Sequence, residues 1–96
     1  MLVLITYDVC VSDDRGAYRL RQIAKYCQKF GQRVQNSVFE CVVDESKFME
    51  IKNELLKLMD EEKDSIRFYK LGNNYKNKVE HYGIKVSYDM TDVFMV

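Results

Sequence analysis

The chain has 96 residues, of which 47% are hydrophobic and 12% aromatic, and its 15 Lys and Arg balance 15 Asp and Glu. This length suits one domain, because a second core would not fit, and the apolar content excludes a disordered tail. A composition without proline and with only four glycines excludes collagen-like and proline-rich classes. We therefore expect a single domain over 1–96, small enough for dimerisation to be a reasonable expectation.

The cysteines and the N-terminal segment point to a cytoplasmic protein. The sequence has three cysteines, Cys10, Cys27 and Cys41, and no two of them lie close together along the chain. We therefore expect reduced thiols that fill the core rather than a disulfide framework or a zinc site. The apolar run 2–5 meets Asp8 too early for a signal peptide or a membrane span. We expect no contact with a membrane.

The first half of the chain predicts a strand followed by a helix. Residues 1–9 are nearly all apolar up to Asp8, which is typical of a central strand covered on both faces. A turn follows, in which Ser12 or Asp13 could cap the next helix. The spacing predicts that helix over 16–30, with Gly31 as its stop signal. Its apolar stripe is Leu20, Ile23, Ala24, Cys27 and Phe30.

The second half predicts two strands, a helix and a further strand. Residues 33–43 are strand-like, with a possible break at Asn36–Ser37. The second helix is expected over 46–62, with a buried stripe of Phe48, Ile51, Leu55 and Leu58, and the next strand over 65–71. A polar segment, 72–83, precedes a possible short strand within 84–96. This order of elements predicts a two-layer sandwich of helices and strands.

The balanced charge hides an asymmetry along the chain. Between Arg15 and Phe39 there are six basic residues and no acidic one, whereas 40–64 carries nine acids against four lysines. The helix cations lie on the arc opposite the apolar stripe, and no carboxylate on that face pairs with them. A solvated helix face is the plain interpretation, but unpaired cations at this spacing favour a phosphate backbone as partner. The candidate contacts are Arg15, Arg19, Arg21, Lys25 and Arg33, with Lys76 and Lys78 from the polar segment.

Asp8 is the candidate for metal chemistry. It ends the first strand, where a carboxylate could bind Mg²⁺ through oxygen ligands. A turn or capping aspartate is the alternative interpretation, and one carboxylate alone makes a poor metal site. In a twofold dimer, however, Asp8 could face its own copy and share one Mg²⁺. The only histidine, His81, has no evident partner, and no nucleophilic triad is indicated. The reaction that these residues can support is metal-assisted phosphodiester hydrolysis.

Several motifs together resemble one known family. Tyr7-Asp8 ends the first strand, Arg19-x-Arg21 lies on the helix, and the run from Gly31 to Glu40 reads GQRVQNSVFE. The later stretches DSIRFY and GNNYKNKVEH fit as well. The sequence thus resembles the bacterial members of the small universal CRISPR-associated family, Cas-two, over nearly the whole chain, and the RVQNSVFE run is the most specific part.

The resemblance implies a fold, an assembly and partners. The fold would be α+β, a ferredoxin-like βαββαβ sandwich with an additional C-terminal strand, in a homodimer formed through paired sheets. The segment of about 72–96 would be an arm that crosses to the partner. The family bridges dimers of the CRISPR integrase, Cas-one, and holds duplex spacer DNA for integration. Several members are magnesium-dependent endonucleases acting on single-stranded RNA or double-stranded DNA.

The family's site residues carry over to five positions. The strand-end aspartate that binds magnesium corresponds to Asp8, shared by two copies across the dimer, and it lies next to Tyr7. The helix arginines correspond to Arg19 and Arg21, the motif arginine to Arg33 and the aromatic to Phe39. The resemblance therefore implies Asp8, Tyr7, Arg19, Arg33 and Phe39 as catalytic residues.

Two other functions remain as alternatives. A ribonuclease toxin of VapD-like type shares this fold, although the RVQNSVFE run and the basic polar segment favour the CRISPR-associated family. The second alternative is a non-catalytic binding module, such as a DNA-binding scaffold or a ferredoxin-like regulatory domain. The acid-free basic helix argues against a small-metabolite sensor, and the signature of an RNA-recognition motif is absent from the sequence.

Overall fold

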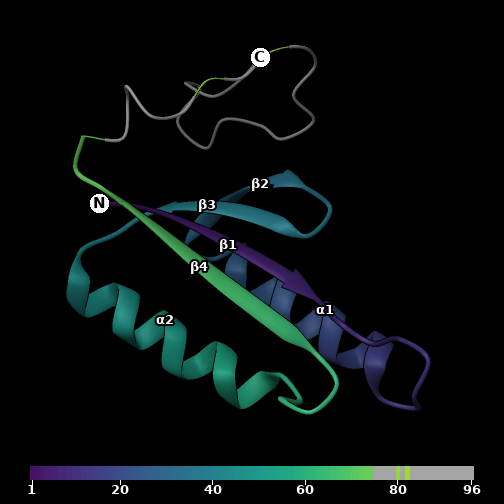
Figure 1. The fold of residues 1–96 in the computed structure, drawn as a ribbon. Helices are drawn as coiled ribbons and strands as arrows, with labels where there is room; N and C mark the ends of the chain where they lie inside the picture. Colours follow the sequence, from purple (N-terminus) through teal and green to yellow (C-terminus); the bar gives the residue numbers. More distant parts are fainter. Residues whose placement is uncertain (75–79, 81, 83–96) are drawn as a thin grey trace.

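The computed structural model describes residues 1–74, 80 and 82. Its elements are, in order, β1 (Leu2–Asp8), α1 (Gly16–Cys27), β2 (Gly31–Gln35), β3 (Val38–Val42), α2 (Glu45–Leu58) and β4 (Ser65–Gly72). The strands form one sheet in the order β2-β3-β1-β4, and every neighbouring pair is antiparallel. Both helices lie on the same side of the sheet (Figure 1). This arrangement confirms the predicted α+β, ferredoxin-like fold.

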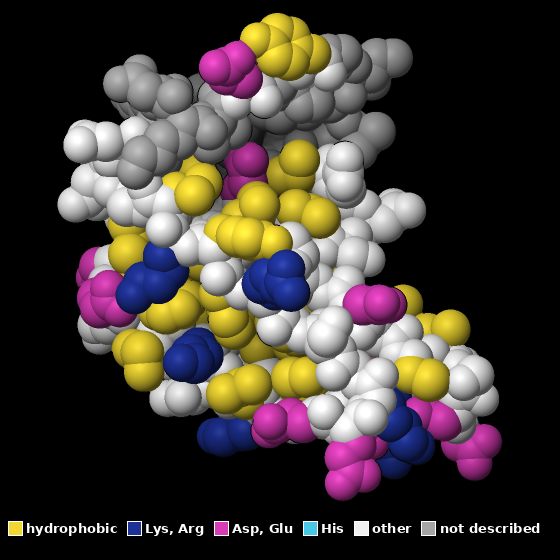
Figure 2. All heavy atoms as spheres, in the orientation of Figure 1, with side chains coloured by type: hydrophobic (Ala, Val, Ile, Leu, Met, Phe, Trp, Pro, Cys, Tyr) yellow, Lys and Arg dark blue, Asp and Glu magenta, His cyan; other side chains and the backbone are white. Residues whose placement is uncertain are grey.

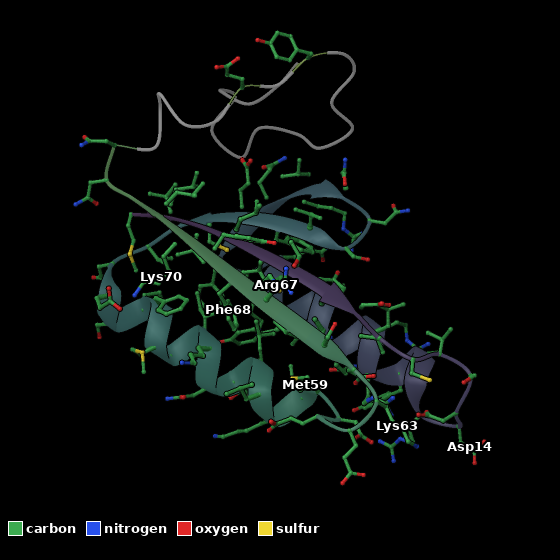
Figure 3. The ribbon with its side chains drawn as sticks, in the orientation of Figure 1. Asp14, Met59, Lys63, Arg67, Phe68 and Lys70 are labelled. Atoms are coloured by element: carbon green, nitrogen blue, oxygen red, sulfur yellow. The ribbon has the colours of Figure 1, made fainter. Side chains whose placement is uncertain are left out.

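The core lies between the sheet and the two helices. Alternate residues of β1, Val3, Ile5 and Tyr7, point into it because successive side chains of a strand point to opposite faces. Ile23 and Cys27 of α1 and Phe48, Ile51 and Leu55 of α2 cover them. Phe68 of β4 lies between its strand and α2 (Figure 3), with its ring edge-on to Phe48 at a centroid distance of 5.5 Å. The predicted apolar stripes of both helices are confirmed.

The helices are shorter than predicted. Helix α1 ends at Cys27 and a turn over 28–30 leads directly into β2, so Gly31 is not the helix stop. Gly31 is needed for close packing instead, since a Cβ there would lie 2.5 Å from the Cys41 Sγ. Helix α2 begins after Asp44, whose carboxylate accepts a hydrogen bond from the Lys47 backbone N–H at 2.7 Å.

A turn at Asn36–Ser37 separates β2 from β3, which confirms the predicted break. Cys27 and Cys41 are buried free thiols, and burial raises the pKa of Cys27 to about 12 and that of Cys41 to about 11.

The possible strand within 84–96 lies outside the described residues. Among the residues that the structure describes, no helix is long and apolar enough to cross a bilayer.

The side of the sheet away from the helices is open within the described part of the chain. It carries outward-facing side chains of three strands, namely Leu4, Thr6 and Asp8 of β1, Val38, Glu40 and Val42 of β3, and Ser65, Arg67 and Tyr69 of β4. Apolar and aromatic groups are exposed here, with Val42 63% and Tyr69 41% accessible. Figure 2 shows hydrophobic side chains around the β4 edge, with Lys and Arg side chains among them. We call this surface the open sheet face.

Candidate functional site

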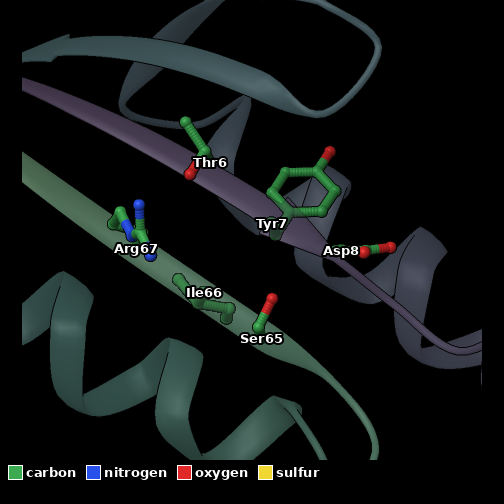
Figure 4. A pocket seen from close by; sticks show the side chains of 6 residues that line it. All are labelled: Thr6, Tyr7, Asp8, Ser65, Ile66 and Arg67. Atoms are coloured by element: carbon green, nitrogen blue, oxygen red, sulfur yellow. The ribbon is translucent and has the colours of Figure 1, made fainter.

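Asp8 lies at the end of β1, in a pocket between β1 and β4 (Figure 4). The lining residues come as two triplets from the paired strands, Thr6, Tyr7 and Asp8 from β1 and Ser65, Ile66 and Arg67 from β4. The antiparallel register sets Asp8 opposite Ser65 and Thr6 opposite Arg67. Asp8 is exposed, and its place in the alternation puts it on the open sheet face with these neighbours. The site therefore combines a carboxylate, two hydroxyls and a guanidinium.

The donor set of this pocket suits a hard cation but contains a single carboxylate. A carboxylate with the nearby hydroxyls of Thr6 and Ser65 offers the oxygen ligands that Mg²⁺ prefers, with waters filling the remaining positions. Within the described residues, however, no group of three or more His, Cys, Asp or Glu side chains is placed to bind a metal ion. Asp8 is the one carboxylate among the six residues that line this pocket. A metal site shared by two copies of Asp8 therefore stays a prediction.

Tyr7, Arg33 and Phe39 form a separate cluster on the other face of the sheet. The Tyr7 and Phe39 rings stack at 6.2 Å between centroids, and the Arg33 guanidinium lies 5.2 Å from the Phe39 centroid. Burial raises the pKa of the Tyr7 phenol, although Arg33 lowers it. Since Tyr7 and Asp8 are adjacent in a strand, their side chains point to opposite faces. The fold therefore brings three of the predicted catalytic residues together, but under the sheet rather than beside Asp8.

Arg19 is bound by two carboxylates, so the prediction that no carboxylate pairs with the helix cations is wrong at this position. Its Nε donates to the Asp64 Oδ2 at 2.7 Å, and its Nη2 donates to the Asp13 Oδ2 at 2.9 Å. The Arg19 side chain is only 12% exposed and that of Asp64 is fully buried. We call these three residues the Arg19 cluster. Its guanidinium already donates to both carboxylates and to the Cys10 carbonyl oxygen, so these groups compete with any phosphate for it.

The Arg19 cluster ties the loop after Asp8 to the loop before β4. The Asp64 Oδ1 accepts from the Cys10 backbone N–H at 3.0 Å, and its Oδ2 accepts from the Asp60 backbone N–H at 2.9 Å. Burial raises the pKa of the Asp64 carboxyl, but the hydrogen bonds from Arg19 and from these backbone groups outweigh burial and hold it below its usual range. The Arg19 guanidinium lowers the pKa of Asp13 in the same way. Lys63 reaches Asp13 from the same end of the molecule (Figure 3).

The remaining cations on and beside α1 are exposed, as predicted. Arg21 and Lys25 lie on the helix, Arg15 precedes it and Lys29 follows it. No ion pair to a carboxylate joins any of them among the residues described. Arg15 lies over the Tyr18 ring at 4.9 Å from its centroid. These side chains are available for a phosphate backbone. The predicted contacts Lys76 and Lys78 fall outside the described part of the chain.

Gly16 sets the distance between α1 and the loop that follows Asp8. A Cβ at this position would overlap the Cys10 carbonyl oxygen and lie 2.5 Å from the Val11 Cα. Both obstacles are backbone, so the loop itself would have to move. We expect Gly16→Ala to lower the free energy of unfolding by roughly 2 kcal/mol, measured by urea denaturation. Ala17→Ser, at the exposed neighbouring position, is the control, and a Gly16→Ala variant as stable as the wild type would contradict this packing.

Two residues of this region received no role from the sequence. Asp64 was counted as one acid among nine and quoted within the DSIRFY stretch, but its partner Arg19 lies 45 positions away, so no local pattern joins the two. Arg67 did carry a signal. The alternation of SIRFYKL puts Arg67 and Tyr69 on one face of β4, opposite the face of Phe68.

The comparisons with known proteins agree with this fold. A family model described as CRISPR associated protein Cas2 matches residues 1–79. The chain belongs to the Cas2 family. A Halalkalibacterium halodurans protein named CRISPR-associated endonuclease Cas2 is 63% identical over 92 residues, which cover 96% of each chain. A Nitratidesulfovibrio vulgaris protein named CRISPR-associated endoribonuclease Cas2 is 61% identical over 89 residues, covering 93% of this chain and 87% of that protein.

Solved structures resemble this chain as well. The crystal structure of Streptococcus pyogenes Cas2 is 53% identical with a TM-score of 0.75, and the match covers 86% of this chain and all of that one. A Thermus thermophilus protein described as hypothetical is 31% identical with a TM-score of 0.71, covering 88% and 92% of the two chains. The family predicted from the YD, RVQNSVFE and DSIRFY motifs is confirmed. The nuclease class predicted for the chain agrees with the names of its Cas2 relatives.

Proposed function

We propose that this Cas2-family chain is a CRISPR adaptation protein that, as a homodimer with the Cas1 integrase, binds duplex spacer DNA for integration into the CRISPR array. We further propose that it is a magnesium-dependent endonuclease that hydrolyses phosphodiester bonds of DNA or RNA. The observation that carries the catalytic part is the exposed Asp8 carboxylate at the end of β1, unpaired among the described residues and flanked by hydroxyls. A cytoplasmic location follows from this role.

The open sheet face supports the homodimer. A small chain that leaves Val42 and Tyr69 exposed on one side of its sheet has apolar surface to bury against a second copy. Asp8 lies on the same face. Pairing two copies through this face about a twofold axis would bring Asp8 toward its counterpart. Two carboxylates, with waters, would then hold one Mg²⁺.

We assign three roles to the candidate residues according to where each lies in the fold: metal binding, positioning and contact with the nucleic-acid backbone. Asp8 of each copy would hold the magnesium ion, which when bound polarises a phosphoryl oxygen and lowers the pKa of its water. Tyr7, Arg33 and Phe39 support β1 from beneath, and Arg19 fixes the loop after Asp8, so all four act as positioning residues. The exposed cations Arg15, Arg21 and Lys25, together with Lys76 and Lys78, would contact the nucleic-acid backbone.

The proposed function is tested with the purified protein at several concentrations. Sizing by light scattering reports the dimer, and a labelled DNA duplex and a labelled single-stranded RNA report binding and cleavage. We expect a dimer that cuts at least one substrate with Mg²⁺ and none with EDTA, and that binds duplex DNA less tightly as salt rises. Retention of the duplex on the Cas1 integrase only when this chain is present would support the adaptation role.

The same experiment separates the alternatives. Cleavage of RNA alone by a protein that binds neither duplex DNA nor the integrase would favour a ribonuclease toxin. Salt-sensitive binding of duplex DNA without cleavage of either substrate would make the chain a scaffold. Binding that does not change with salt would contradict the contact between the exposed helix cations and phosphates.

A further inference from the structure

Arg67 is a cation of the Asp8 pocket that no carboxylate neutralises within the described residues. It is exposed on β4, it lines the pocket beside Asp8 and Ser65, and it lies on the same sheet face as Asp8 (Figure 4). No ion pair joins Arg67 to an acidic side chain in the described part of the chain. Arg19, in contrast, is bound by two carboxylates, and Lys70 of the same strand is bound by Glu45 at 2.9 Å.

The two charges of the pocket lie on one face of the sheet without pairing. Because Thr6 is opposite Arg67 and Asp8 opposite Ser65, Asp8 and Arg67 are diagonal neighbours on one face, about 7–8 Å apart between Cα atoms. Arg67 donates instead to the Tyr69 hydroxyl, at 3.2 Å, and its guanidinium lies 6.0 Å from the Tyr69 ring centroid. One Nη1–H is used in this bond, and Nε and Nη2 have no described acceptor. An anion between the two side chains could be reached by both.

We propose that Arg67 is a substrate-binding catalytic residue of this site, whose guanidinium binds the two non-bridging oxygens of the phosphate group that lies at Asp8. The geometry assigns to Tyr69 the role of a positioning residue that directs the Arg67 guanidinium. The inference rests on the proposed nuclease function and adds to it the group that holds the reacting phosphate.

The chemistry fits a phosphodiester better than a neutral or cationic ligand. A guanidinium with free N–H groups binds two phosphate oxygens in parallel, which a lysine ammonium cannot do. The hydrogen bond to Tyr69 raises the pKa of Arg67, which stays protonated throughout the physiological range. A fixed positive charge near the reacting phosphate stabilises the negative charge that develops there during hydrolysis. A metal ion on Asp8 and a cation on Arg67 would hold the same phosphate from two sides.

The test compares Arg67→Gln and Arg67→Lys with a matched control on the same strand. Lys70→Gln removes the same charge from β4 but on the face toward α2, where Lys70 lies over the Phe48 ring (Figure 3). We expect Arg67→Gln to lower kcat/KM for the cleaved substrate by about 100-fold. Arg67→Lys should recover about tenfold of this loss, because charge returns without the paired donors. Tyr69→Phe, which removes only the hydroxyl, should lie between Arg67→Lys and the wild type, and Lys70→Gln within twofold of wild type.

Two results would overturn the proposal. In the first, Arg67→Gln behaves like Lys70→Gln while Asp8→Asn abolishes cleavage, which would leave the nuclease function intact and remove Arg67 from it. In the second, Arg67 binds a carboxylate of the second copy. Sizing would then show a weakened dimer, and cleavage by Arg67→Gln would return to the wild-type level at high protein concentration.

If the wild type cuts neither substrate, the nuclease function fails and binding decides the question for Arg67. The probe is then a 12-nucleotide single-stranded RNA in EDTA, titrated at several salt concentrations. Loss of one phosphate contact should reduce the slope of log K against log salt by about 0.7 for Arg67→Gln. An unchanged slope would overturn the contact.

Discussion

Replacing Asp64 with asparagine is expected to lower the free energy of unfolding by about 3–5 kcal/mol, the range for removing one partner of a buried ion pair. The asparagine side chain has nearly the same shape but only one acceptor atom. Each Asp64 oxygen accepts from one backbone N–H and from Arg19, namely Oδ1 from Cys10 and Oδ2 from Asp60. Whichever way the amide is oriented, its NH₂ group faces two donors.

The measurement is urea denaturation of the variant and the wild type, with Asp14→Asn as the control. Asp14 is an exposed carboxylate in the loop after β1, which the Arg19 cluster ties to the loop of Asp64 (Figure 3). Its replacement should change stability by less than about 0.5 kcal/mol. Equal stability of Asp64→Asn and Asp14→Asn would show that the Arg19 cluster is not formed in solution.

The difference between Asp64→Asn and the wild type should also depend on pH. The folded protein holds the Asp64 pKa below its unfolded value of about 3.9. A group whose pKa is lowered on folding contributes its full stability above the unfolded pKa, and the contribution is lost as pH falls through the folded pKa. Denaturation at pH 7, 5 and 3 should therefore show a constant difference between pH 7 and 5 and a smaller one at pH 3. A difference that grew on acidification would contradict the sign of this shift.

Asp8→Asn is expected to reduce magnesium-dependent cleavage by about 10³-fold without destabilising the fold. Loss of a metal ligand removes several kcal/mol of transition-state stabilisation, and each 1.4 kcal/mol changes the rate about tenfold. Asp8 is exposed, and no ion pair or side-chain hydrogen bond holds it within the described residues. Its removal should therefore leave the thermal midpoint and the binding of duplex DNA unchanged.

The variant is compared with Asp14→Asn in the same preparation and at a concentration where the dimer is complete. Cleavage by Asp14→Asn should equal that of the wild type. Cleavage that survives in Asp8→Asn would assign the activity to another site or to a contaminant. Loss of cleavage together with loss of the dimer would indicate a structural role for Asp8 at the interface.

Much of the fold followed from local patterns in the sequence. The apolar spacing of the helices and the break at Asn36–Ser37 indicated the βαββαβ order, because each of these signals lies within a few residues of chain. The end of α1 was misplaced because Gly31 was interpreted as a helix stop. Its actual constraint is the approach of Cys41 from the neighbouring strand, which depends on sheet pairing rather than on local sequence.

The place of Asp8 in the fold could be predicted from the sequence better than the geometry around it. Asp8 was assigned from its position at the end of a strand, and it does line a pocket there. The grouping of Tyr7 with Asp8 as neighbours in one site neglected the alternation of side chains along β1. The partner of Arg19 depends on the meeting of two loops in space, and no pattern of charges along α1 contains that information.

The alternation of β1 also limits how this protein can change over evolutionary time. A deletion of one residue within the strand would exchange its two faces, turning Tyr7 toward solvent and Asp8 into the apolar interior. A deletion that moved the Asp8 carboxylate off the open sheet face would thus also disrupt the packing of the core. Substitutions on the open sheet face are not limited by packing in the core. Lineages can therefore alter what this face binds, position by position, while insertions and deletions are confined to the loops.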